Sequence, residues 1–211
     1  MASEISRRSV LKRTVVIAGA AGLSSATGSA AAWAAPGPAL APSAGKPSAN
    51  GWGMEEGADD GGWIWTRPVP GTGLAVPLRI GEVETVLVHV LRRFHYEVQA
   101  LGTGDVRAHV APGAFAAPHE SNHASGTAVC VRPASYPLTA RDGLFPPQVE
   151  TIRHILADCE GVVTWGGDLK PLHEAHFEIA VRPGDARLQE VADKILAWNR
   201  TPGEGAGAWA G

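Results

Sequence analysis

The sequence predicts a single small domain of the α+β class, and three observations support this prediction. Apolar residues recur at the spacing of amphipathic helices in three segments, and short apolar runs with the length of buried strands lie between them. The 211 residues, 45% hydrophobic and 18% charged, suit one soluble domain with tails. The 26 glycines and 16 prolines predict many loops. We expect residues 51–200 to form this domain, as a monomer.

The first half of the domain combines an irregular start with one helix. Residues 51–72 carry three of the seven tryptophans in a glycine-rich, acidic context, and we expect an irregular arm that packs its indoles onto the core. Residues 80–91 are predicted to be helical, because their apolar side chains fall on one helical face. Residues 94–101 either continue this helix or form a strand.

The second half alternates strands and helices. Short apolar runs predict buried strands at residues 127–131, 162–165 and 176–181. Apolar residues at helical spacing predict two further helices, at residues 147–159 and 186–198, and Gly161 follows the first of them as a stop signal. The tail at residues 201–211 is rich in glycine and alanine, and we expect it to be flexible.

The N-terminal residues 1–34 have the pattern of an export signal. The pair Arg7-Arg8 precedes a weakly apolar run and an Ala32-Trp33-Ala34 cleavage site, which indicates a twin-arginine signal peptide. A transmembrane anchor is the alternative, but glycines and serines interrupt the run, and a span needs about 20 predominantly apolar residues. Residues 35–50 are rich in proline, alanine and serine and predict a flexible linker. We therefore expect a secreted or cell-wall-associated protein with no membrane span after signal cleavage.

The charge balance of the chain bears on whether it binds nucleic acid. The chain has 18 basic and 21 acidic residues and a net charge of −3. Binding to phosphate backbones needs a surplus of basic residues. We therefore expect no nucleic-acid partner.

Two segments about 50 residues apart hold the residues with metal chemistry. His123 lies in a turn that leads into an apolar strand, Cys130 lies on that strand, and His176 begins another strand. Imidazole nitrogen and thiolate sulfur both bind zinc, and three protein ligands leave a fourth position open, as in catalytic sites. His173 precedes His176 by three residues and could act on water there. The alternative is structural: a turn histidine, a small core cysteine and a packed strand histidine.

Two nearby features bear on this hypothesis. His119 lies four residues before His123 and could line the same site. Cys130 and Cys159 could instead form a disulfide in an exported protein, which would remove Cys130 from any metal.

Both segments resemble motifs of the M15 metallopeptidases, the family of D-Ala-D-Ala carboxypeptidases and L-Ala-D-Glu endolysin peptidases. Residues 121–130 resemble its S-x-H-x-x-G-x-A-x-D motif, and residues 165–178 resemble its W-G-G-D motif followed by (D/E)-x-x-H-F-E. The resemblance covers residues 76–181. It implies a small antiparallel sheet with helices on one side, zinc bound by His123 and His176, and an arginine that polarises the scissile carbonyl. Arg107 is the nearest candidate for that arginine.

The sequence departs from these motifs at two positions. Cys130 stands where the family has its aspartate ligand, and His173 stands where it has the acidic general base, with Glu174 one residue further on. Thiolate keeps the charge of the ligand but makes a bound metal a weaker Lewis acid. A neutral imidazole can accept a proton near neutral pH, so His173 remains a candidate base, with Glu174 as the alternative.

Three functions from different classes remain open on these residues. The first is a zinc-dependent metallopeptidase, acting as a carboxypeptidase or endopeptidase on cell-wall (peptidoglycan) peptides. The second is a non-catalytic relative that binds wall peptide or another protein. The third is a copper protein, because two histidines and one cysteine are the ligand types of blue-copper centres.

Overall fold

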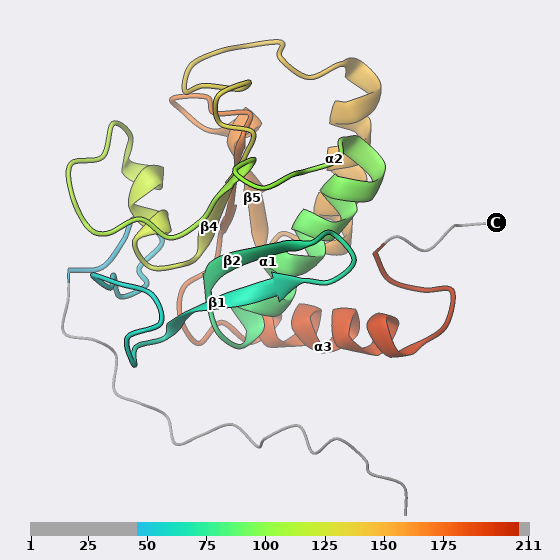
Figure 1. Ribbon diagram of the computed structural model, residues 1–211, viewed down its shortest axis with the longest axis horizontal. Helices are drawn as coiled ribbons and strands as arrows, with labels where there is room; N and C mark the ends of the chain where they lie inside the picture. The colour runs from blue at the N-terminus through green and yellow to red at the C-terminus, as the bar shows by residue number, and fades with distance from the viewer. Residues whose placement is uncertain (1–45, 207–211) are drawn as a thin grey trace, which may run out of the picture. The chain divides into compact units, whose positions relative to one another are not determined.

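The computed structural model describes residues 46–206 (Figure 1). The expected signal peptide, most of the linker and the end of the tail lie outside the described residues. Three helices form the helical part: α1 (Glu82–Arg93), α2 (Pro146–Asp158) and α3 (Ala186–Arg200). The strands are β1 (Ile64–Val69), β2 (Leu74–Arg79), β3 (Val106–Arg107), β4 (Ala128–Val131), β5 (Val163–Trp165) and β6 (His176–Ile179). The described chain is a small α+β domain, as predicted.

Three short helical turns complete the elements. Residues 94–98 continue α1 as a π-helical turn, η1 (Phe94–Val98), so the helical alternative for this segment is correct. Two 3₁₀ turns, η2 (Pro118–His123) and η3 (Gly166–Asp168), come before β4 and after β5. No helix among residues 46–206 is long and apolar enough to cross a membrane.

A four-stranded antiparallel sheet in the order β3-β4-β6-β5 forms the centre of the domain. Val129 pairs with Phe177 across β4 and β6, and Phe177 packs edge-on against Phe94 at 6.0 Å between ring centroids. This face therefore packs towards the helices, and Figure 1 shows α1 and α2 on the same side of the sheet. Because side chains alternate along a strand, the residues between these face the other side. All residues of β4 and β6 are buried, so both faces of the sheet centre are covered.

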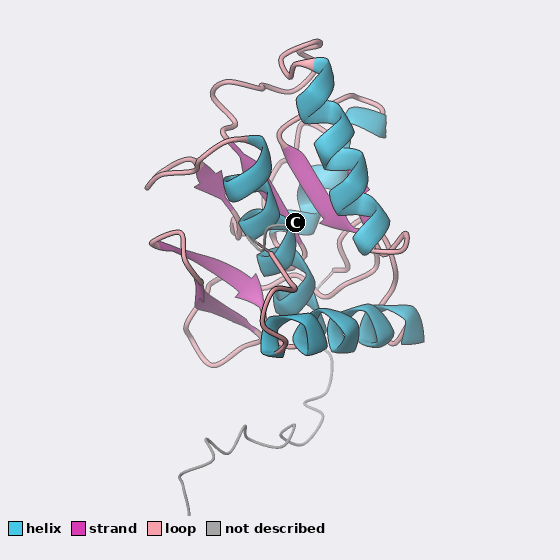
Figure 2. Cartoon of the chain, turned by 90° about the vertical axis from the view of Figure 1, so that its right-hand side faces the viewer, coloured by secondary structure: helices cyan, strands magenta, loops and turns pink. Residues whose placement is uncertain are grey.

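The segment at residues 51–72 corrects the expectation of an irregular arm. Its second half pairs with residues 74–79 as the antiparallel hairpin β1–β2, seen from another side in Figure 2. Pro68 and Pro77 hid this hairpin in the sequence, because proline cannot donate a ladder hydrogen bond. A two-stranded ribbon tolerates it, since both strands are edges. The expected indole packing holds for Trp52, which is buried and donates from Nε1 to the Val181 carbonyl at 2.8 Å.

Both ends of the described chain are also more ordered than expected. The last linker residues pack against the turn between η2 and β4: Ser48 is buried, its hydroxyl bonds to that of Ser125 at 3.0 Å, and the Ala49 amide donates to Ser121 Oγ at 2.8 Å. The fold therefore begins before residue 51. Composition could not reveal this, because hydrogen bonds rather than apolar side chains hold the segment. In the expected tail, the Ala206 carbonyl accepts from Arg92 Nη2 at 2.9 Å.

Candidate metal centre

Strand register gathers several polar side chains on the face of the sheet opposite α1 and α2. Cys130 pairs directly with His176 on β6 and with Arg107 on β3. Directly paired residues point to the same side of a sheet, and so do residues two apart along one strand. Glu178 therefore shares this face with His176, and the three strands form the floor of one site.

The 3₁₀ turn η2 adds two histidines above this floor. His119 and His123 both lie in η2 and are buried. The chain returns to β4 through Gly126, whose φ of +67° is unfavourable for other residues. A Cβ at this position would lie 2.8 Å from the Arg79 backbone nitrogen, so the turn also needs the small residue for close packing.

The spacing of three ligand atoms fits a tetrahedral metal ion. Cys130 Sγ lies 3.4 Å from His123 Nε2 and 3.7 Å from His176 Nδ1. Zinc–nitrogen bonds of about 2.0–2.1 Å and zinc–sulfur bonds of about 2.3 Å place tetrahedral N and S ligands about 3.6 Å apart. The two measured distances lie on either side of this value. All three residues are buried, and their ligand atoms lie within 4.8 Å of one another.

The second nitrogen of each ligating imidazole already has a partner. His123 Nδ1 lies 2.7 Å from the Ala108 carbonyl, which accepts its proton and leaves Nε2 free as a ligand. His176 Nε2 lies 2.8 Å from Glu178 Oε2, and the same oxygen accepts from Asn122 Nδ2 at 2.7 Å. A histidine that donates to a carboxylate or a carbonyl while its other nitrogen binds metal is the usual arrangement in metalloproteins. The described residues can therefore hold a metal, as predicted.

Burial sets the protonation of the centre. It lowers the pKa of His123 and of His176 well below the usual imidazole range, so both rings are neutral and able to bind a metal. Burial raises the pKa of the Cys130 thiol to about 11, although the charge of Arg107 opposes the shift. Metal binding at neutral pH must therefore displace a proton from Cys130.

His173 and His119 lie beside the three ligands. His173 Nε2 is 4.0 Å from Cys130 Sγ, and its ring stacks on that of His176 at 5.8 Å between centroids. The His119 ring lies 4.8 Å from that of His176. The sequence predicted that His173 acts at this centre and that His119 could line it. In the structure, both side chains lie beside the three ligands.

Gly166 fixes the position of His173. Its carbonyl accepts from the His173 amide at 2.8 Å. A Cβ on Gly166 would lie 2.1 Å from the His173 carbonyl oxygen and 2.9 Å from His176 Cβ. The Trp165-Gly166-Gly167-Asp168 segment thus supports the centre through close backbone packing.

Glu174 does not reach the centre. Its carboxylate accepts from the Asp142 and Gly143 amides at 3.0 and 2.9 Å and is held by this loop. Glu174 lies in the turn that the His176 amide closes onto the His173 carbonyl at 2.9 Å, and its side chain is directed to the loop at residues 142–143. The structure therefore gives no support to Glu174 as the alternative base, because its carboxylate is engaged with this loop.

Arg107 lies at the edge of the centre. Its Nη2 is 3.8 Å from Cys130 Sγ and 3.7 Å from Glu120 Oε1. Its side chain is 44% exposed, so the guanidinium can meet a molecule that enters from solvent. Glu120 belongs to neither motif and is brought to the centre only by the 3₁₀ turn η2, so no sequence pattern pointed to it.

The structure also places the two cysteines and two residues of the W-G-G-D motif, Trp165 and Asp168. Both cysteines are free and buried, so the disulfide alternative does not apply here. Trp165 is a buried aromatic residue that donates to the Glu174 carbonyl at 2.7 Å. Asp168 pairs with Arg153, at 2.7 Å between Oδ1 and Nη2.

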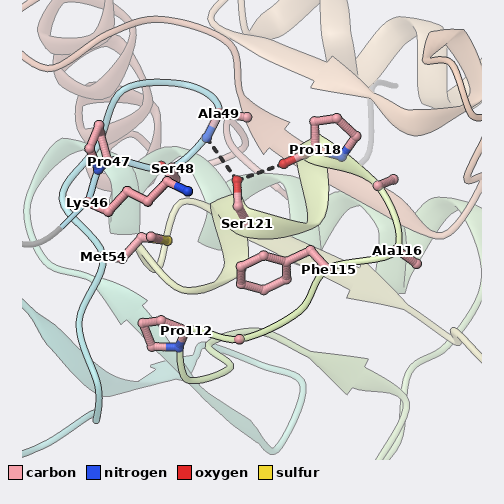
Figure 3. A pocket seen from close by; sticks show the side chains of 12 residues that line it. Lys46, Pro47, Ser48, Ala49, Met54, Pro112, Phe115, Ala116, Pro118 and Ser121 are labelled. Atoms are coloured by element: carbon pink, nitrogen blue, oxygen red, sulfur yellow. Dashed lines mark hydrogen bonds between the residues drawn. The ribbon is translucent and has the colours of Figure 1, made fainter.

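Two pockets share lining residues, and the smaller one reaches the centre. The inner pocket, of about 250 Å³, is lined by residues that include Arg107, Glu120 and His123. The outer pocket, of about 700 Å³, shares Gly113 and Phe115 with it. Figure 3 shows the Phe115 and Met54 side chains in the outer pocket, with Ser121 bonded to Ala49 and Pro118 beside them.

Comparison of the chain with protein-family models, curated proteins and solved structures finds no match.

Proposed function

We propose that this protein is an exported, zinc-dependent peptidase that acts on cell-wall peptides. One observation carries the proposal: His123, Cys130 and His176 offer ligand atoms at tetrahedral spacing, and both imidazoles have partners for their second nitrogens. The expected signal peptide and the resemblance to M15 motifs supply the location and the substrate class.

Each remaining residue of the centre has a role in this proposal. Bound zinc supplies a Lewis acid that polarises a carbonyl and makes water a stronger acid. His173 is neutral, since burial lowers its pKa, and its imidazole accepts the proton that the attacking water releases. Arg107 donates to the carbonyl oxygen of the scissile bond, and Glu120 orients its guanidinium.

The two pockets provide room for a peptide on one side of the scissile bond. The inner pocket places a substrate residue beside Arg107 and His123. The outer pocket continues it with an apolar lining of Met54, Phe115 and several prolines and alanines, which suits small aliphatic side chains. A short peptide rich in alanine fits this lining.

Metal content and cleavage test the proposal separately. Protein purified without chelators should contain about one zinc per chain and should release products from purified muropeptides, followed by mass spectrometry. His123→Ala should lose both properties, and the matched control His154→Ala should keep both, because His154 is exposed on α2. Zinc without cleavage would leave a non-catalytic metal-binding protein, and absence of metal would overturn the proposal.

One observation favours copper as a second candidate. The three ligand atoms are one sulfur and two imidazole nitrogens, with no carboxylate oxygen among them. Two histidines and one thiolate suit copper as well as zinc. An intense visible absorption after addition of Cu(II) to the metal-free protein, absent in Cys130→Ser, would support a copper centre. A colourless complex would favour zinc.

A further inference from the structure

A second group of three histidines overlaps the candidate metal centre. His119, His173 and His176 each offer a nitrogen, and these nitrogens lie within 4.8 Å of one another. The ring centroids of His119 and His173 are 6.1 Å apart. His119 comes from η2, whereas His173 and His176 come from the turn that begins β6, so two separate segments build this group as well.

Two histidines of this group, His119 and His173, each have one buried ring nitrogen without a hydrogen-bond partner among the described residues. His119 and His173 are only 6% and 2% exposed. His119 Nε2 and His173 Nδ1 are buried and have no hydrogen-bond partner among the described residues. Buried polar atoms in native proteins are nearly always satisfied, so two unsatisfied imidazole nitrogens at a candidate metal centre favour a bound ligand. On His173 the unsatisfied atom is Nδ1, whereas Nε2 lies 4.0 Å from Cys130 Sγ. His176, the third member of the group, and His123 both have partners for a ring nitrogen.

His176 belongs to both groups but has one nitrogen to give. Its Nε2 is engaged with Glu178 at 2.8 Å, which leaves Nδ1 for a metal. Nδ1 can serve only one ion at a time. The two groups therefore describe alternative positions of a single ion.

We propose that His119, His173 and His176 form an alternative, all-imidazole position for the metal ion of this centre. Three neutral imidazoles with an open fourth position are an established donor set for catalytic zinc. The two positions share His176, so the ion occupies one of them at a time. The inference rests on the metal binding proposed above but does not require peptidase activity.

Cobalt(II) alone is a suitable probe, because a bound thiolate gives an intense charge-transfer band that imidazole does not. The wild-type protein should bind one cobalt per chain with this band. Cys130→Ala should still bind one cobalt per chain but without the band. Adding His119→Ala to Cys130→Ala removes a proposed ligand, so it should weaken cobalt binding by more than about 10-fold, the smallest loss typical of removing even a partner of a ligand.

Matched variants show whether His119 itself holds the ion when the thiolate is absent. Cys130→Ala with His154→Ala should bind cobalt as Cys130→Ala does, because His154 is exposed and distant from the centre in sequence. Circular dichroism checks folding, and Cys130→Ser replaces Cys130→Ala if the alanine variant does not fold. A folded Cys130 variant that binds no cobalt would overturn the all-imidazole position alone. The same conclusion follows if His119→Ala weakens binding equally with and without Cys130. Absence of cobalt binding by the wild-type protein would overturn the proposed function too.

Discussion

Glu178→Gln isolates the contribution of one buried charge to metal affinity. Glu178 Oε2 accepts from both His176 Nε2 and Asn122 Nδ2, at 2.8 and 2.7 Å. The carbonyl oxygen of glutamine has two lone pairs and can accept both bonds in the same place, so the substitution removes the charge and keeps the shape. The carboxylate makes His176 a more basic ligand, and loss of such a partner typically weakens metal binding about 10–100-fold. That range corresponds to about 1.4–2.8 kcal/mol of binding free energy.

The assay is competition for zinc against a chromophoric chelator, with Glu190→Gln as control. Glu190 is an exposed acid on α3, so its variant should bind zinc like the wild-type protein. Glu178→Ala should lose more than Glu178→Gln and should also unfold more easily, because it leaves two buried donors without an acceptor. If Glu178→Gln binds zinc as tightly as the wild-type protein, then Glu178 does not support His176 as a ligand.

Three further predictions concern close packing, pH and catalysis. Gly166→Ala should lower both stability and zinc affinity, because its Cβ would lie 2.1 Å from the His173 carbonyl oxygen. Thermal melting and chelator competition measure the two effects, and unchanged values would refute the packing argument. Burial lowers the pKa of His89, although the Asp158 partner opposes the shift. The contribution of His89 to stability is therefore present above about pH 6.5, its unfolded-state pKa, and is lost as the pH falls through the lower folded-state pKa. Urea unfolding at several pH values should show this loss, and His89→Gln should reduce it; an equal slope in both proteins would contradict it. Finally, Cys130→Asp with His173→Asp should cleave muropeptides faster than the product of the single effects predicts, because both residues act on one water molecule. With zinc bound, no cleavage by the double variant would show that the missing carboxylates do not limit activity.

The sequence predicted the parts of the fold that depend on periodic apolar residues. Helices α1, α2 and α3 and strands β4, β5 and β6 all lie within a few residues of their expected positions. The β1–β2 hairpin was missed because tryptophans and prolines obscure its alternation, and the packing of Ser48 was missed because it depends on hydrogen bonds between distant segments. No pattern in one sequence reveals such long-range bonds.

The candidate site was predictable where local spacing and strand alternation decide it. Cys130 and His176 converge because neighbouring antiparallel strands pair them directly. The position of His119 depends on the 3₁₀ turn η2, whose sequence has no helical period, so its role could only be suggested. Glu178 lies within the second motif, but its contact with His176 follows from their spacing of two residues along β6.

The same strand register explains how a substitution at residue 130 can change the chemistry of this face while the positions of the facing residues stay the same. Cys130 and His176 face each other whatever side chain stands at residue 130, because the ladder between β4 and β6 sets their separation. A thiolate at this position keeps the negative charge of a carboxylate ligand but gives more electron density to a metal. In the proposed zinc site the metal would polarise water less, and His173 would have only a neutral ring with which to accept the proton. Tight metal binding and fast hydrolysis therefore depend on different residues of this centre, and each must be measured in its own assay.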